Sequence, residues 1–330
     1  MNAKTNITPL ELLNRCRGLH IAVVGDLMLD RYLVGKVERI SPEAPVPIVD
    51  VREEFILPGG AANVLQNISA VGAIPEPFGV IGEDADGIAL RQLLESFGCE
   101  TDGIVAVSDR PTTVKTRVLA DAHHVVRFDR EHRSDIAGAI GKILIAKLRE
   151  RVATGEIKAV ILQDYNKGVL RTSVIREAIA IAREKNVPVL VDPKQKNFFE
   201  YVGVTVFKPN LREMKTAMNH SMEGENGLLE GVRKLRELLQ ANYILLTRGA
   251  QGMTLHSEAN TVSIPTEARK VADVSGAGDT VIATMAAVMA AGGDAFTAAK
   301  IANYAAGIVV GEVGAVPVKF DQLREAVSQL

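Results

Sequence analysis

A short segment near the C-terminus combines glycines with a carboxylate in a spacing that suits chemistry on a phosphate. It reads Asp273-Val274-Ser275-Gly276-Ala277-Gly278-Asp279-Thr280, and the small apolar residues from Val281 to Ala291 predict a buried helix after it. The glycines should then lie at a helix N-terminus, where free N–H groups and the helix dipole favour an anion. A carboxylate beside such a site would repel a bound phosphate. It is useful there if it accepts a proton from the hydroxyl group that attacks the phosphate. Our candidate catalytic residues are therefore Gly276, Ala277, Gly278 and Asp279.

The same residues could serve two different purposes. Asp279 could be an ordinary acid in the first turn of a helix, which the helix dipole favours, and the sequence leaves this open. The glycines could belong to a dinucleotide-binding fingerprint, but that motif needs a third glycine three residues after the second, and Val281 occupies that position. The fingerprint is therefore excluded.

A second glycine-rich segment, Gly59-Gly60-Ala61-Ala62-Asn63, precedes another predicted helix. Glycine allows the backbone to approach a ligand closely, and the Asn63 amide offers both a donor and an acceptor to hydroxyl groups. The simpler interpretation is a tight turn before a helix. The presence of the first segment makes a ligand site the better interpretation.

Polar residues also follow several predicted strands. The sequence alternates apolar runs of strand length with helical patterns, which predicts one α/β domain over residues 1–330 with a doubly wound, mostly parallel sheet flanked by helices. Ligands bind beyond the carboxyl ends of such strands. The polar residues at these ends are Asp26, Asp30, Asp164, Lys167, Asp192, Lys194, Lys208, Asn210, Glu213, Thr247 and Arg248, and the last of these is followed by a glycine-rich turn with Gly249 and Gly252. Asn210 and Glu213 could equally form a helix capping box.

Two segments, approximately 31–57 and 112–129, change to short alternating patterns that suit strands outside the main sheet, so we expect a small β-strand lid. The second segment carries Lys115, Arg117 and Arg127. Alternation places Lys115 and Arg117 on the same face of a strand. These cations could form a solvated charged face or a cradle for a phosphate on the substrate.

Composition narrows the class of partner. The chain has 330 residues and a net charge of −2, without long basic runs, so we expect no nucleic acid and no membrane as partner and a small molecule instead. Its two cysteines fit neither a disulfide framework nor a zinc site. The N-terminal residues lack the apolar core of a signal peptide, so we expect a cytoplasmic protein.

The GAGD segment and the earlier GGAANV segment, Gly59 to Val64, occur in the order found in the ribokinase or PfkB family of carbohydrate kinases, and the chain resembles that family over nearly its whole length. The resemblance implies a ribokinase-like fold that uses ATP and Mg²⁺, and a homodimer that forms through the lid. It places Asp30, Gly59, Gly60 and Asn63 around the sugar. Asn210 and Glu213 would help to hold Mg²⁺ through water, and Asn303 would lie beside the adenine. Contacts with the nucleotide are implied for Lys208, Thr247, Arg248, Gly249 and Gly252.

A narrower resemblance is to the family members that phosphorylate the anomeric hydroxyl of D-glycero-β-D-manno-heptose 7-phosphate in ADP-heptose and lipopolysaccharide biosynthesis. It is carried by residues 25–32, 39–47, 164–168 and 302–314. We take Lys115, Arg117, Arg127, Asp164, Lys167, Asp192 and Lys194 as candidates for binding the phosphosugar, of which Asp164 and Lys167 lie in a segment that carries this resemblance. Many relatives also carry a nucleotidyltransferase with a histidine-rich motif that is absent here, so we expect another protein to perform adenylylation. Val274 replaces a usual hydroxyl residue. A kinase of another phosphosugar and a catalytically silent nucleotide-binding regulator remain alternatives.

Overall fold

The computed structural model describes residues 7–121, 123–219, 222, 224–268, 270–312 and 314–328. Its main sheet has nine strands in the order β13-β12-β11-β10-β9-β8-β1-β4-β5, and all neighbours from β11 to β5 pair in parallel. The strands are β1 (His20–Gly25), β4 (Ile74–Gly82), β5 (Ile104–Val107), β8 (Ile157–Gln163), β9 (Val189–Asp192), β10 (Val206–Phe207), β11 (Tyr243–Thr247), β12 (Met253–His256) and β13 (Thr261–Ile264). In this sheet, the pairs β11–β12 and β12–β13 are antiparallel. The expected mostly parallel, doubly wound sheet is confirmed.

Helices cover both faces of this sheet, and the alternation of side chains along β1 explains why. Ile21 and Val23 pack into one apolar cluster, whereas Ala22 and Val24 pack into another on the opposite face. The first cluster includes side chains of α1 (Pro9–Arg15), α2 (Ala61–Ala70), α3 (Ala85–Ser96), α8 (Ala277–Ala290), α9 (Ala295–Val309) and α10 (Phe320–Val327). The second includes side chains of α4 (Gly138–Ala153), α5 (Thr172–Glu184), α6 (Leu211–Met218) and α7 (Gly224–Leu239). Short 3₁₀ turns lie at η1 (Gln195–Asn197) and η2 (Gly249–Gln251).

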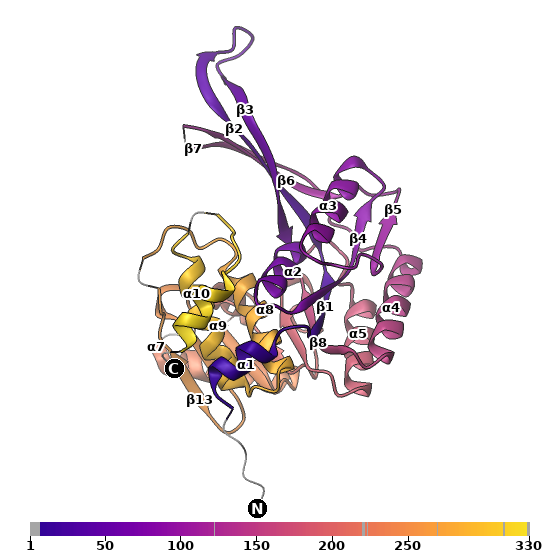
Figure 1. Cartoon of the computed structure of the whole chain (residues 1–330), viewed down its shortest axis with the longest axis vertical. Helices are drawn as coiled ribbons and strands as arrows, with labels where there is room; N and C mark the ends of the chain where they lie inside the picture. The colour runs from indigo at the N-terminus through magenta and orange to yellow at the C-terminus, as the bar shows by residue number, and fades with distance from the viewer. Residues whose placement is uncertain are drawn as a thin grey trace, which may run out of the picture.

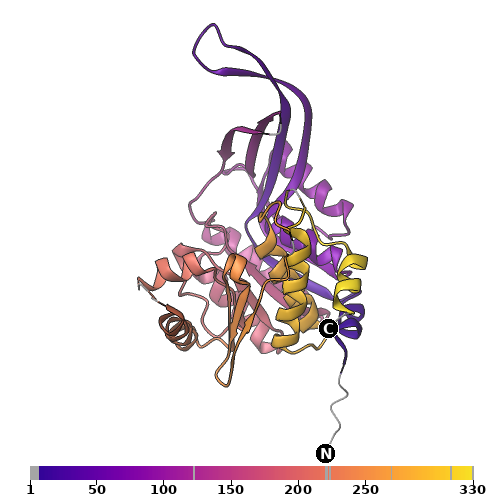
Figure 2. The ribbon, with the colours of Figure 1, turned by 90° about the vertical axis from the view of Figure 1, so that its left-hand side faces the viewer.

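A second sheet of four strands projects from this body, as Figures 1 and 2 show. Its strands are β2 (Leu27–Ile40), β3 (Pro47–Gly60), β6 (Thr113–Ala120) and β7 (His123–Arg130), in the order β3-β2-β6-β7. β2 starts as a buried strand and becomes exposed toward its tip, and every residue of β7 is exposed. We call these four strands the projecting sheet.

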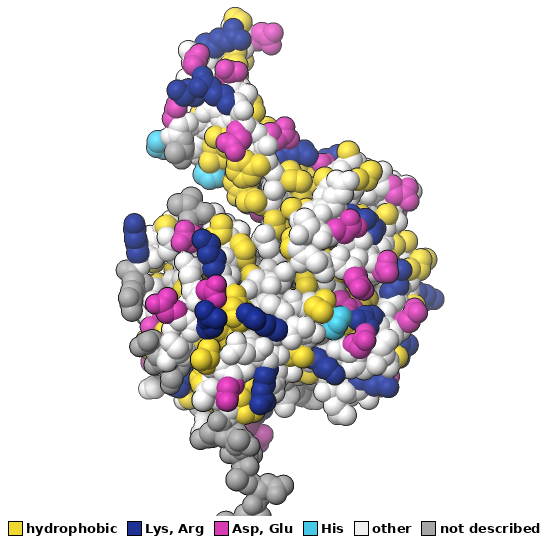
Figure 3. Space-filling model, viewed as in Figure 1, with side chains coloured by type: hydrophobic (Ala, Val, Ile, Leu, Met, Phe, Trp, Pro, Cys, Tyr) yellow, Lys and Arg dark blue, Asp and Glu magenta, His cyan; other side chains and the backbone are white. Residues whose placement is uncertain are grey.

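The projecting sheet carries exposed apolar side chains. Phe128 is 54% exposed and Val126 is 51% exposed, although aromatic and β-branched side chains are usually covered in a folded protein. Ile40 and Val51 on β2 and β3 are also exposed. Figure 3 shows hydrophobic side chains gathered on this sheet where it leaves the body.

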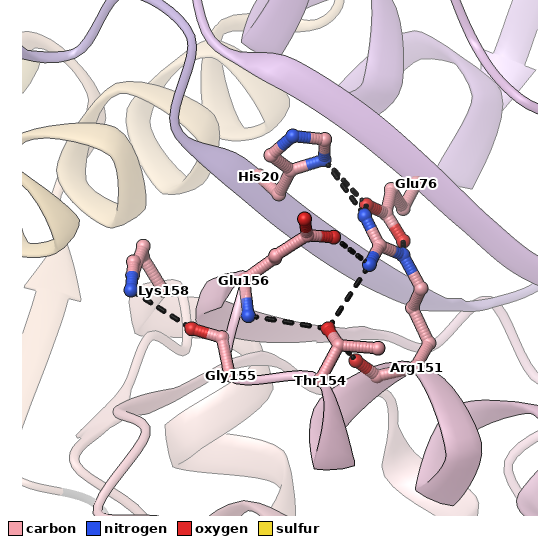
Figure 4. Close-up of polar contacts among 7 residues, drawn as sticks. All are labelled: His20, Glu76, Arg151, Thr154, Gly155, Glu156 and Lys158. Carbon is pink, nitrogen blue, oxygen red and sulfur yellow. Dashed lines mark hydrogen bonds and ion pairs between the residues drawn. The ribbon is translucent and has the colours of Figure 1, made fainter.

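A polar cluster joins α4, β1 and β4 at the edge of the main sheet where β1, β4 and β8 begin (Figure 4). The Arg151 guanidinium, in the last turn of α4, donates to both oxygens of Glu76 on β4, at 2.7 Å from Nε and 2.6 Å from Nη2. His20 Nδ1 lies 2.6 Å from the same carboxylate, and Arg151 also pairs with Glu156. The cluster therefore anchors α4 to the starts of β1 and β4.

Among the described residues, no helix has the combined length and apolar character that a passage through a lipid bilayer requires.

Candidate active site

The glycine loop before α8 adopts the expected geometry. Gly276 is the N-cap residue, with φ of +78° in the left-handed region that favours glycine, and α8 begins at Ala277. A Cβ atom on Gly276 would lie 3.0 Å from Asn63 Nδ2 and 3.1 Å from the Ala315 Cβ. Both the backbone conformation and the close approach of Asn63 therefore require glycine here. Ala277 N donates to the Val274 carbonyl at 3.4 Å, while the N–H groups of Gly276 and Gly278 make no backbone hydrogen bond among the described residues and could meet an anion.

Asp279, in the first turn of α8, is a buried carboxylate with three side-chain donors. Asn63 Nδ2 donates to its Oδ2 atom at 2.7 Å, while Gln163 Nε2 and the Tyr165 hydroxyl donate to Oδ1 at 3.0 and 2.9 Å. Burial, followed by the charge of Asp192, raises the pKa of Asp279 to about 6, although the hydrogen bonds from Asn63 and Tyr165 lower it. Asp279 is thus ionised near neutral pH and more basic than an exposed aspartate.

Two lysines lie beside the glycine loop, each paired with an acid. Lys208 Nζ lies 3.0 Å from Asp192 Oδ2, and a Cβ atom on Gly278 would lie 3.3 Å from the same nitrogen. Lys194 Nζ pairs with Glu213 Oε1. The strand ends after β9 and β10 therefore bring two ammonium groups into this region, and the one on Lys208 faces the start of α8.

Asn210 and Glu213 form the capping box of α6. Asn210 N donates to Glu213 Oε2 at 2.9 Å, and Glu213 N donates to Asn210 Oδ1 at 2.8 Å. The capping box that the sequence left open is therefore present in the structure. It also fixes Glu213 where it pairs with Lys194.

The residues expected around the sugar converge at the base of the projecting sheet. Arg117 Nη1 lies 2.9 Å from Asp30 Oδ1, and a Cβ atom on Gly59 would lie 3.1 Å from the same carboxyl group. Gly60 precedes α2 with φ of +57°, which brings Asn63 toward Asp279. Lys115, on the strand that carries Arg117, places its ammonium 5.3 Å from the centre of the Tyr165 ring. Burial lowers the pKa of Lys115.

Three other residues expected to bind substrate make different contacts. Lys167 Nζ lies 2.6 Å from Glu131 Oε2. Arg127 pairs with Asp129 on exposed β7, and its side chain is 56% exposed. The carboxylate of Asp164 is buried, where it accepts bonds of 2.7 Å from the Tyr201 hydroxyl and from Asn166 N. Burial and then Asp26 raise the pKa of Asp164 to about 6.

The residues expected near the nucleotide lie along the ends of β10 and β11 and on α9. Thr247 N donates to the Pro209 carbonyl at 3.1 Å, which aligns this strand end with the start of α6. Arg248 makes a two-pronged pair with Glu225, 2.9 Å for each bond, and its backbone N–H donates to Gly252 O across the turn that contains Gly249. Asn303 is buried and donates to the Pro265 carbonyl at 2.7 Å.

Two residues that we did not select, Gln163 and Tyr165, hold Asp279, and Asp26, which we noted only as an acid at a strand end, holds the loop beside it. Gln163 and Tyr165 both contact Asp279, and buried Asp26 accepts bonds from the backbone of Tyr165, Lys167 and Val169. The available signal was the place of these residues at and just after the end of β8, because ligands bind beyond the carboxyl ends of such strands.

Comparison with known sequences gives one family and close relatives. The family described as pfkB family carbohydrate kinase matches residues 19–320. The bifunctional protein HldE of Methylobacillus flagellatus is 41% identical over 309 residues, which are 92% of this chain and 62% of that protein. The HldE protein of Pelobacter propionicus is 41% identical over 96% of this chain and 65% of its own length. The chain therefore spans less than two thirds of the length of these curated relatives.

Comparison with solved structures gives the same fold at low identity. Arabidopsis thaliana ribokinase, complexed with ribose and ATP, superposes with a TM-score of 0.72 at 19% identity and covers 94% of this chain and 98% of its own. Phosphofructokinase-2 from Escherichia coli, in complex with potassium, gives 0.76 at 16% identity over 95% and 98%. The ribokinase-like fold is thus confirmed.

Proposed function

This chain belongs to the pfkB family of carbohydrate kinases, and from that premise we propose that it transfers the γ-phosphoryl group of ATP to the anomeric hydroxyl of D-glycero-β-D-manno-heptose 7-phosphate. The product would be the 1,7-bisphosphate, an intermediate on the way to ADP-heptose and the inner core of lipopolysaccharide. Adenylylation would be a separate reaction. The heptose assignment rests on the motifs at residues 25–32, 39–47, 164–168 and 302–314.

The observation that carries the proposal is the placement of Asp279 in the first turn of α8, beside the N–H groups of Gly276 to Gly278. Asp279 takes the proton of the anomeric hydroxyl as the oxygen of that hydroxyl attacks the γ-phosphorus. The new P–O bond forms as the bond to the bridging β–γ oxygen breaks, and ADP leaves. The N–H groups and the Lys208 ammonium face the charge of the transferring group.

The acceptor site is proposed between α2 and the projecting sheet. Asn63, Gly59 and Gly60 border Asp279 on one side, while the paired Asp30 and Arg117 border it on the other. Asp30 is an acceptor for sugar hydroxyls in this arrangement.

The sugar phosphate is proposed to bind the cationic side chains at the base of the projecting sheet, mainly Lys115 and Lys194. Both ammonium groups lie within 5.5 Å of the Tyr165 ring centre. Lys167 and the more exposed Arg127 would join them on closure of the sheet, and Asp164 and Asp192 would hold the surrounding loops.

The residues around Glu213 fit a Mg²⁺ ion that is held through water. Each oxygen of Glu213 has one contact in the structure, and a carboxylate offers about four acceptor positions. No group of three acidic, histidine or cysteine side chains among the described residues forms a metal site, which suits an ion that keeps several waters and binds substrate phosphates. Bound with ATP, Mg²⁺ neutralises phosphate charge. Asn210 orients Glu213.

The nucleotide is proposed to lie along the ends of β10 and β11. Lys208, Thr247 and the glycine turn at Gly249 to Gly252 would contact its phosphates. Asn303, which fixes the Pro265 carbonyl, would shape the wall beside the adenine. Arg248 would reach the phosphates only by exchanging its Glu225 partner.

We further propose that residues 1–330 act as one kinase domain whose projecting sheet is a lid, and that two copies pair through it. The exposed apolar residues of this sheet, including Val126 and Phe128, supply a surface that pairing would cover. The two cysteines, Cys16 and Cys99, are free and buried, which suits a cytoplasmic location.

The test is ADP release with ATP and Mg²⁺ over heptose 7-phosphate, sedoheptulose 7-phosphate, fructose 6-phosphate and unphosphorylated heptose. We expect turnover on the aldoheptose phosphate, and a loss of about 10²–10⁴-fold in Asp279→Ala with ATP binding retained. Turnover on another phosphosugar alone would remove the heptose assignment. ATP binding without turnover on any sugar would favour a silent regulator, and near-normal turnover by Asp279→Ala would exclude this aspartate as the base.

A further inference from the structure

Tyr165 contacts two parts of the proposed site that have different chemistry. Its hydroxyl donates to Asp279 Oδ1 at 2.9 Å. Its ring lies near two ammonium groups, with Lys115 Nζ at 5.3 Å and Lys194 Nζ at 5.5 Å from the ring centre. These distances are within the range of cation–π attraction. One side chain thus touches the base and both lysines proposed for the sugar phosphate.

The backbone of Tyr165 is held by a buried carboxylate. Tyr165 N donates to Asp26 Oδ2 at 2.8 Å, and Asp26 is 1% exposed. Lys167 N and Val169 N donate to the same carboxylate at 3.0 and 3.2 Å. Displacing Tyr165 would therefore break a charge-assisted hydrogen bond where water cannot replace it.

The two oxygens of Asp279 differ in how many donors they meet. Oδ1 accepts from Gln163 and Tyr165, whereas Asn63 is the donor to Oδ2 among the described residues. Since each carboxylate oxygen has about two acceptor positions, Oδ1 is fully occupied and Oδ2 keeps one position. Oδ2 is therefore the oxygen that can meet an acceptor hydroxyl.

Lys115 and Lys194 differ in their ion pairs. Lys194 pairs with Glu213, while Lys115 forms no ion pair with a described residue. Because Lys115 has no carboxylate partner to release, a phosphate dianion that arrives there could pair with its ammonium directly. The Tyr165 ring, whose hydroxyl contacts Asp279, lies near both ammonium groups.

We propose that Tyr165 is a positioning residue with two separable functions. Its hydroxyl fixes Asp279 so that Oδ2 faces the acceptor, and its ring holds Lys115 and Lys194 as the pair that binds a phosphomonoester on the acceptor. The second function rests on the proposed kinase activity, whereas the first concerns a contact within the protein itself.

The hydroxyl is tested by Tyr165→Phe, with Tyr201→Phe as a matched control. Tyr201 also donates from a buried hydroxyl to an aspartate, Asp164, whose pKa is likewise about 6. Carboxyl ¹³C NMR of the substrate-free protein, assigned with Asp279→Ala, should show the Asp279 pKa rising by about 1 unit in Tyr165→Phe and not in Tyr201→Phe. The acid limb of kcat/KM should shift in the same way. An unchanged Asp279 pKa in Tyr165→Phe would overturn this function whatever the acceptor is.

The ring is tested by comparing Tyr165→Phe, which keeps it, with Tyr165→Leu, which removes it. Dissociation constants for inorganic phosphate, read from backbone amide shifts, require no turnover. Phosphate should bind about tenfold more weakly to Tyr165→Leu than to Tyr165→Phe, and the KM for the phosphosugar should follow while the KM for ATP stays equal. Equal phosphate affinities would overturn the ring's function. Absence of turnover on heptose 7-phosphate would count against the proposed substrate and leave both readouts interpretable.

Discussion

Asn63 Nδ2 lies 2.7 Å from Asp279 Oδ2, although 216 positions of sequence separate the two residues. Each belongs to the first turn of its helix, α2 and α8. The next residue of α8, Thr280, donates its hydroxyl at 2.7 Å to Oδ1 of Asn67, which lies one turn beyond Asn63 on α2, in the buried interface. Polar bonds therefore fix the alignment of the two helices, and with it the position of the proposed base relative to the proposed sugar site.

The raised pKa of Asp279 predicts opposite effects of pH on activity and stability. As a base it must be ionised, so kcat/KM should fall as the pH drops through about 6. The folded protein binds a proton between the ordinary pKa of 3.8 and about 6 that the unfolded chain has released, so the free energy of unfolding should decrease as pH rises through that window. Urea unfolding of the wild type at about pH 4 and about pH 7 measures this, and Asp279→Ala should show a smaller decrease. An equal decrease in both proteins would contradict the assignment.

Gly276→Ala should impair catalysis more than its effect on folding explains. The added Cβ would meet Asn63 Nδ2 at 3.0 Å in a left-handed conformation, so Asn63 must move away from Asp279. Gly292→Ala is a matched control, because φ is +92° there and nothing lies within 4 Å of the added Cβ. Both variants should lose about 1–2 kcal/mol of stability. Only Gly276→Ala should lose at least about tenfold in kcat, and a similar kcat in both variants would show that Asn63 need not be held so closely.

Lys115→Met should weaken binding of the acceptor selectively. Its ammonium points toward Tyr165 at the base of the projecting sheet, so we expect the KM for the phosphosugar to rise about tenfold or more while the KM for ATP changes little. Arg52→Met on β3 of the same sheet is the control, because Arg52 is 53% exposed and pairs only weakly with Glu38 at 3.4 Å. Steady-state kinetics with each substrate varied in turn gives both constants. An equal rise in both KM values would argue against a phosphate cradle.

Arg151→Met should destabilise the protein and leave catalysis intact. It removes both bonds to the Glu76 carboxylate, whose side chain is 7% exposed, and leaves that charge beside His20 (Figure 4). We expect the free energy of unfolding to fall by about 3 kcal/mol. This is at the low end for buried ion pairs because the Arg151 side chain is 23% exposed. Arg149→Met on the same helix breaks an exposed pair with Glu184 and should change stability by less than about 0.5 kcal/mol. Chemical denaturation checks both, and equal losses would refute the assigned importance of the buried pair.

Local signals in the sequence were sufficient for the elements that position the site. The glycines before Val281 predicted the start of α8, and the spacing of Asn210 and Glu213 indicated the capping box that the structure contains as one of two alternatives. Alternating strand and helix patterns predicted the main sheet, because burial on both faces requires continuous apolar strands. These features depend on neighbours within a few residues.

Contacts between distant side chains were not predictable in the same way. The bonds from Gln163 and Tyr165 to Asp279 depend on how α8 docks against the end of β8, which no local pattern specifies. Likewise, the pairing of Arg248 with Glu225 depends on the position of α7. The sequence correctly indicated which strand ends carry polar residues. Which partner each side chain meets is determined by how the helices and strands pack together.

The contact between α2 and α8 also constrains the chain during its synthesis. Helix α2 buries Val64, Leu65 and Ile68 in the same apolar cluster as α8. At about 5–20 residues per second, a ribosome needs on the order of ten to forty seconds to add the 216 positions between Asn63 and Asp279. During that interval the side of α2 that packs on α8 stays uncovered, although β1, β3 and β4 can already pack on its other side. A premature stop before α8 would leave a product with this exposed apolar side for proteases and chaperones to remove.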